Sequence, residues 1–119
     1  MARVEVVPTE VENLTTGISV KIADLTAFTS DKAQFDNNGD CWVVLHNADA
    51  VAHTVTVNTT NATRNVGFAD PAFVLAAGDH KEFGPFDMTA LNTVGKIYLD
   101  PEVGEEAHLF YKVLKHRHY

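Results

Sequence analysis

Short runs of alternating apolar and polar residues, separated by turn-forming residues, recur along most of this chain. In residues 18–22 the β-branched side chains occupy every second position, which places them on one face of an extended strand. Residues 3–7 and 51–58 alternate in the same way, and we expect Val55 and Val57 to point inward. Runs of this length, bounded by turns, are typical of an all-β domain.

Residues 41–47 differ from these runs because their apolar side chains fall on both faces of the segment. This pattern predicts a central strand that is covered on both sides. The preceding turn, residues 36–40, contains Asn and Gly residues that tolerate positive φ. Since only a short loop separates 41–47 from 51–58, we expect these two strands to pair as a hairpin.

The second half of the chain repeats this alternation of strands and turns. The runs that predict further strands are residues 73–75, 80–86, 96–99 and 107–114. Pro85 cannot donate a ladder hydrogen bond, so the strand 80–86 either lies at a sheet edge or ends there. Residues 23–35 form the one segment that could hold a short helix.

Seven or eight strands with short connections predict one antiparallel β-sandwich over residues 1–119, with immunoglobulin-like or jelly-roll topology. We expect residues 1–12 to form an N-terminal arm and residues 115–119 a basic C-terminal tail. The predicted core residues are Val20, Ile22, Trp42, Val44, Val55, Val57, Phe83, Ile97, Leu99, Leu109 and Tyr111.

Composition narrows the range of partners. The 119 residues include 9 basic and 16 acidic side chains, a net charge of −7 that repels phosphates and argues against nucleic-acid binding. No apolar run approaches membrane-spanning length, so we expect a soluble protein made in a cytoplasm. Cys41 is the single cysteine, which excludes an intrachain disulfide, and its apolar neighbours predict a buried thiol.

The six histidines are the first candidates for metal chemistry. In the expected hairpin, His46 and His53 would lie on adjacent strands, and a zinc site would need His80 or Asp49 as a third ligand. We expect both histidines to be ordinary residues at the ends of the loop. The acidic residues of 100–106 are interpreted as a solvated turn, and His116 and His118 of the terminal segment as part of a solvated tail.

Other cofactor and catalytic motifs do not fit the chain. The spacing of Cys41, the histidines and the methionines does not match a blue-copper site. The turn at 36–40 has Asn47 where a calcium-binding EF-hand loop requires Glu. No nucleophile elbow or glycine-rich phosphate loop is present. We therefore expect no catalytic, cofactor-binding or metal-binding residues, and a protein that is not an enzyme.

The order of several short motifs is more informative. An Asn-Asn-Gly turn at 37–39 precedes a strand that ends in Asn47, and an Ala-Ala-Gly turn at 76–78 precedes Gly-Pro-Phe at 84–86. A strand that begins at Gly95 and a last strand at 109–113 complete the order. Over residues 34 to 114 the chain resembles the small head decoration, or cement, proteins of tailed bacteriophages. It departs from them in a longer, more polar segment at 58–71 and in its basic C-terminal end.

This resemblance implies a structural protein of the virion that binds the outside of the assembled head and stabilises it. Its partner would be the major capsid protein or another virion protein, and a homo-oligomer such as a trimer would be compatible with the capsid surface. The alternatives are a tail or neck component and a glycan- or surface-binding β-sandwich module. The candidate partner contacts lie near the two ends of the chain: Arg3, Val4, Val6, Val7, Lys112, Lys115 and Arg117.

Overall fold

Strands and two single-turn 3₁₀ helices make up the regular structure of the computed structural model, which describes residues 3–11, 22–37, 39–58, 71–84 and 95–116. Ten strands lie in these residues: β1 (Val4–Glu5), β2 (Thr9–Val11), β3 (Thr26–Ala27), β4 (Ala33–Asp36), β5 (Cys41–Asn47), β6 (His53–Val57), β7 (Ala72–Leu75), β8 (His80–Phe83), β9 (Lys96–Pro101) and β10 (Leu109–His116). The 3₁₀ helices are η1 (Ile22–Asp24) and η2 (Glu106–His108). Neither of these two helices is long enough to span a membrane.

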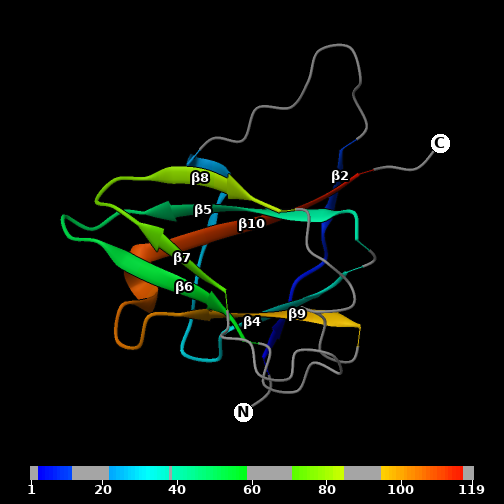
Figure 1. The fold of residues 1–119 in the computed structure, drawn as a ribbon, viewed down its shortest axis with the longest axis horizontal. Coiled ribbons are helices and arrows are strands. Elements are labelled where there is room, and N and C mark those ends of the chain that lie inside the picture. Colours follow the sequence, from blue (N-terminus) through cyan, green and yellow to red (C-terminus); the bar gives the residue numbers. More distant parts are fainter. Residues whose placement is uncertain (1–2, 12–21, 38, 59–70, 85–94, 117–119) are drawn as a thin grey trace.

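Strands β3 to β10 form two antiparallel sheets that face each other (Figure 1). One sheet has the order β4-β9-β6-β7 and the other β3-β10-β5-β8. From β3 to β10, every link between consecutive strands passes from one sheet to the other, apart from the β6–β7 connection. This strand order is that of a jelly roll. The predicted all-β sandwich is therefore confirmed, in the second of its two expected topologies.

The N-terminal segment adds two short strands that the sequence pattern did not separate. β1 pairs in parallel with β4 at the edge of one sheet, and β2 pairs in parallel with β10 in the other. Between them, the Val6 amide donates a 2.8 Å hydrogen bond to the carbonyl of Gln34. Residues 3–11 of the expected N-terminal arm are thus bound to both sheets through their backbone.

Strands β5 and β6 do not form the predicted hairpin. β5 lies between β10 and β8, whereas β6 lies between β7 and β9 in the opposite sheet. The Asn47 side chain holds the loop in its crossing path: Oδ1 accepts the Asp49 amide at 2.9 Å and Nδ2 donates to the Val51 carbonyl at 2.8 Å. These bonds turn the chain out of its own sheet directly after β5.

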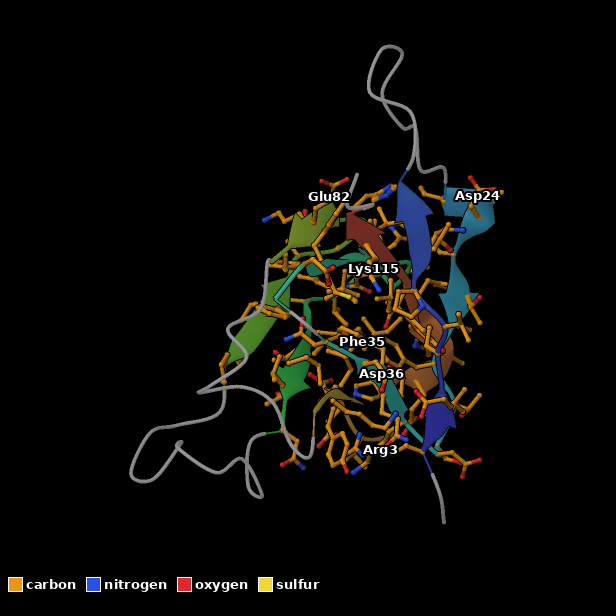
Figure 2. The ribbon with its side chains drawn as sticks, turned by 90° about the vertical axis from the view of Figure 1, so that its right-hand side faces the viewer. Arg3, Asp24, Phe35, Asp36, Glu82 and Lys115 are labelled. Atoms are coloured by element: carbon orange, nitrogen blue, oxygen red, sulfur yellow. The ribbon has the colours of Figure 1, made fainter. Side chains whose placement is uncertain are left out.

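Residues 23–35 hold strands where a helix was considered. After η1, Phe28 and the β4 residues Ala33 and Phe35 are buried, and the period of two in β4 points Phe35 into the space between the sheets (Figure 2). Ile22 was predicted in the core but is 51% exposed, because it begins η1 rather than continuing a strand. Residues 18–21, which include the predicted core residue Val20, lie outside the described residues.

The main core fills the space between the two sheets, and β5 contributes to it from one face only. Val43 and Leu45 belong to this inner cluster. Val44 points the other way and packs with Leu25 and Leu114 in a smaller outer cluster, flanked by the half-buried Trp42 and Phe110. The prediction that this strand is covered on both faces is confirmed. The other predicted core residues are buried or pack against the core: Val55, Val57, Phe83, Ile97, Leu99, Leu109 and Tyr111.

β8 is an edge strand that ends immediately before Gly84, as Pro85 led us to expect. Gly84 has φ +135, and a Cβ at this position would lie 2.7 Å from Trp42 Cβ. Only glycine accommodates both this backbone conformation and the close approach to β5.

Candidate functional site

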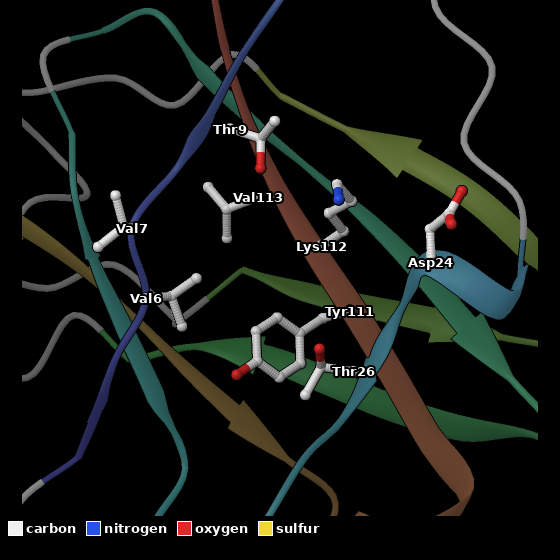
Figure 3. A pocket seen from close by; sticks show the side chains of 8 residues that line it. All are labelled: Val6, Val7, Thr9, Asp24, Thr26, Tyr111, Lys112 and Val113. Atoms are coloured by element: carbon white, nitrogen blue, oxygen red, sulfur yellow. The ribbon is translucent and has the colours of Figure 1, made fainter.

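A surface pocket of about 160 Å³ lies against β10, between the N-terminal segment and the segment that contains η1 and β3 (Figure 3). We call it the β10 groove. Its lining residues are Val6, Val7, Thr9, Asp24, Thr26, Tyr111, Lys112 and Val113. Figure 3 shows the two valines on one side of β10 and Asp24 on the other.

The groove exists because two short strands share one edge of a long strand. β3 pairs with β10 at Phe110 and Tyr111, whereas β2 pairs with it from Leu114 onward. Lys112 and Val113 lie between these two registers and line the groove. The pocket therefore lies where neither β2 nor β3 pairs with the edge of β10. An extended segment of another chain can pair at such an edge.

Three of the candidate partner contacts meet in this groove. Val6, Val7 and Lys112 line it together, although they come from opposite ends of the chain. Val6 is half-buried and packs against the core, whereas Val7 is 83% exposed. The structure thus brings together contacts from the two ends of the chain, which the sequence had suggested as separate contact regions.

The other candidate contacts lie elsewhere. Arg3 is only 15% exposed and forms a 2.7 Å ion pair with Asp100, and its guanidinium lies over the ring of Tyr98. These contacts give Arg3 a structural role within its own sheet. Val4 lies in β1 and Lys115 in β10, and neither lines the groove. Arg117 lies outside the described residues.

A second group of polar side chains gathers where the β5–β6 loop meets the turn before β10, at the left of Figure 1. We call it the loop-end cluster; its members are Asp49, His53, Glu102, Glu105 and His108. The two loops meet because β5 and β10 are antiparallel neighbours, with Asn47 opposite Leu109. The Ala48 amide donates to the His108 carbonyl at 2.9 Å and joins the loops directly.

His53 is the centre of this cluster and its side chain is only 4% exposed. Its Nδ1 lies 2.8 Å from Glu102 Oε2, and its Nε2 lies 2.7 Å from Asp49 Oδ2. Glu105 Oε2 lies 3.4 Å from the same Nε2 and 2.8 Å from His108 Nδ1. The His53 and His108 rings are stacked, with planes 8° apart.

Charge complementarity shapes this cluster. The hydrogen bond to Asp49, and then that to Glu102, raises the pKa of His53 above its usual value. In return, the hydrogen bonds from His53 and from the Ala50 amide lower the pKa of the Asp49 carboxyl. With a carboxylate at each ring nitrogen, His53 donates from both nitrogens when no other cation is bound.

The sequence suggested that His46 and His53 are neighbours, but the structure places each beside a different histidine. His46 lies opposite His80 on neighbouring strands, and its Nδ1 lies 2.9 Å from the carbonyl oxygen of Asp79. Of the two donors considered for His53, Asp49 is beside it and His80 is not. Sequence reasoning missed His108 as a neighbour, because only the pairing of β5 with β10 brings the two loops together. The acidic character of residues 100–106 was the available signal.

Cys41 lies at the opposite end of β5 from this cluster and is 1% exposed, as predicted for a buried thiol. Its Sγ lies 3.4 Å from the Asp36 carbonyl oxygen and 3.7 Å from Asp40 Oδ1. Burial, with the nearby Asp40 carboxylate, raises the pKa of the thiol to about 11. The side chain is therefore protonated at neutral pH.

No protein-family model, curated protein or solved structure matches this chain. The likeness to head decoration proteins therefore stays a prediction from short motifs.

Proposed function

We propose that this chain is a structural protein of a bacteriophage virion that binds the outside of the assembled head and stabilises the shell. It is made in the host cytoplasm, and its partner is the major capsid protein. The ordered motifs between residues 34 and 114 support this proposal. Its jelly-roll order is also one that viral capsid domains use, although a fold alone does not establish function.

The observation that carries the proposal is the convergence of Val6, Val7 and Lys112 in the β10 groove. The two valines offer an apolar surface, and Lys112 offers a cation at the rim. Such a groove suits an extended segment of a coat subunit that carries an apolar side chain next to an acidic one. The break between β2 and β3 provides the space for that segment.

Stabilisation of the shell follows from mass action. A protein that binds the assembled lattice but not the free subunits lowers the free energy of the assembled state by an amount that grows with its concentration. Many equivalent sites on one head repeat this contribution. No catalytic step is needed.

Binding to shells tests the proposal. Purified protein mixed with undecorated heads should bind saturably, as measured by co-sedimentation. Val7→Asp places a charge on the 83% exposed valine of the groove and should weaken binding at least about tenfold. Val74→Asp is the matched control, since Val74 is also exposed, at 64%, but lies on β7 in the other sheet.

The outcomes separate the possibilities. An absence of binding to every head preparation would contradict the proposal. If Val7→Asp leaves binding unchanged, the β10 groove is not the surface that contacts the shell. The number of copies per particle distinguishes decoration, with many copies, from a tail or neck component, and cross-linking on the shell would reveal a trimer.

A further inference from the structure

The loop-end cluster combines four side chains of metal-binding types at one point. Asp49 Oδ2, His53 Nε2, Glu105 Oε2 and His108 Nδ1 come from two loops that are far apart in the sequence, and the candidate ligand atoms of these residues all lie within 4.8 Å of one another. Two imidazole nitrogens with two carboxylates form a donor set that zinc binds in proteins. We propose that these four residues form a structural binding site for zinc or a similar divalent transition metal.

Four of the six distances between the ligand atoms are close to those of a tetrahedral site, and the other two lie within 4.8 Å, so the ligands would move closer together around an ion. Ligand atoms that are 2.0–2.1 Å from a tetrahedral zinc lie about 3.3 Å from one another. His53 Nε2 to Glu105 Oε2 is 3.4 Å, and His108 Nδ1 to Asp49 Oδ2 is 3.5 Å. The other two neighbouring pairs are at 2.7 and 2.8 Å, hydrogen-bond distances that need to open by only about 0.5 Å around a cation.

Glu102 supplies a feature that metal-binding histidines commonly have. Its Oε2 accepts a hydrogen bond from His53 Nδ1 at 2.8 Å, so the opposite nitrogen faces the other ligands. A carboxylate in this position fixes the orientation of the imidazole ring and makes its free nitrogen a better ligand. Glu102 is thus a positioning residue for His53 and not a ligand itself.

The backbone holds the ligands in place without a metal. The Glu105 amide donates to the Glu102 carbonyl at 3.0 Å, and the His108 amide donates to the Glu105 carbonyl at 3.0 Å. On the other loop, the Asn47 side chain accepts the Asp49 amide. His53 is buried, whereas the side chain of His108 is 49% exposed, so the site is closed on one side and accessible to ions on the other.

The metal would cross-link the β5–β6 loop to the turn before β10. With four protein ligands, no coordination position of a tetrahedral zinc stays open for substrate, which indicates a structural and not a catalytic role. Because the metal binds the folded state alone, it also raises thermal stability, by an amount that grows with the logarithm of the metal concentration once the site is saturated. The inference does not depend on the proposed binding to phage heads.

Zinc titration of the chelator-treated protein tests the site. The chain also contains His116 and His118 near its C-terminus, so the titration uses a His116→Ala, His118→Ala background to remove binding by that segment. We expect one zinc ion per chain by isothermal titration calorimetry, together with a rise in the melting temperature.

Ligand variants identify the residues. His108→Ala should lower zinc affinity at least about 100-fold while the metal-free protein stays folded, because this side chain is half-exposed. Asp49→Asn is a second ligand variant that avoids the buried histidine. His80→Asn is the control, since it changes an exposed histidine that lies on β8 beside His46 and should leave zinc affinity unchanged.

An absence of zinc binding in the background variant would overturn the proposal and leave an ion-pair network only. Binding that survives both His108→Ala and Asp49→Asn would also overturn it. Loss of binding in His80→Asn would place the metal at His46 and His80 instead of the loop-end cluster, and would also overturn the proposal. Because no step involves phage heads, failure here leaves the proposed virion function standing, and the converse is also true.

Discussion

Potential metal ligands lie near both ends of strand β5: a protonated thiol at its start, and imidazoles with carboxylate neighbours beyond its end. At its start, the Cys41 thiol lies beside Asp40, and a carboxylate next to a buried thiol disfavours the thiolate that a metal requires. Beyond its end, Asp49, Glu102 and Glu105 surround two imidazoles, which bind a metal in their neutral form and share it with carboxylates. Acidic neighbours therefore keep the Cys41 thiol protonated at one end of β5. At the other end they complete the proposed set of ligands around the two imidazoles.

Cys41 reactivity is the largest difference that this comparison predicts. At pH 8, Cys41 in the folded protein should react with iodoacetamide about 1,000-fold more slowly than in denaturant. Raising the pKa from 9.0 to about 11 removes about 100-fold of thiolate, and burial removes the rest. The folded-state rate should increase about tenfold per pH unit up to pH 10, as quenched-flow mass spectrometry can measure.

Asp40→Asn provides the control for that measurement. It removes the neighbouring charge without changing the size of the side chain, so the thiol pKa should fall and alkylation should become faster. Equal rates in folded and unfolded wild-type protein would contradict the assignment of Cys41 as a buried, protonated thiol.

Packing also distinguishes the two ends of β5. Gly84→Ala should lower the free energy of unfolding by about 3 kcal/mol, because the new Cβ would lie 2.7 Å from Trp42 Cβ, next to Cys41. Gly104→Ala, in the turn that carries Glu105, should cost about 1 kcal/mol, since its φ is +84 but no atom lies within 4 Å of the new Cβ. Urea denaturation measures both, and equal losses would show that the contact with Trp42 does not matter.

The smallest predicted effect concerns the positioning of His53. Glu102→Gln should lower zinc affinity about tenfold, because the metal ligands stay intact while the charged acceptor at His53 Nδ1 is lost. Glu106→Gln in the same turn is the control and should leave affinity within about twofold, since Glu106 has no contact with either histidine of the cluster among the described interactions. An equal loss in both variants would indicate a general effect of negative charge.

The sequence predicted most strands but not how they pair. Residues 41–47 and 96–99 were correctly predicted as strands, because alternation and turn residues are local properties. The expected β5–β6 hairpin was wrong, because whether a short loop reverses within a sheet or crosses to the other depends on hydrogen bonds such as those of Asn47. For residues 23–35 a short helix was considered, but β3 and β4 form there, since Ala33 and Phe35 of β4 are buried in the core.

The loop-end cluster could be predicted only in part. His53 and Asp49 are four residues apart, and their association was considered from the sequence. His108 and Glu105 are more than fifty residues further along and join them only through the pairing of β5 with β10. Long-range strand order, not residue type, was the missing information.

Cobalt(II) substitution tests the central claim most directly, because cobalt reports which end of β5 binds it. Added to the chelator-treated protein with the His116→Ala, His118→Ala background, cobalt should produce the intense visible absorption of a tetrahedral ion with nitrogen and oxygen ligands. No thiolate-to-cobalt charge-transfer band should appear in the near ultraviolet, since Cys41 remains protonated and buried. A thiolate band, or a spectrum identical to that of free hydrated cobalt, would contradict the account.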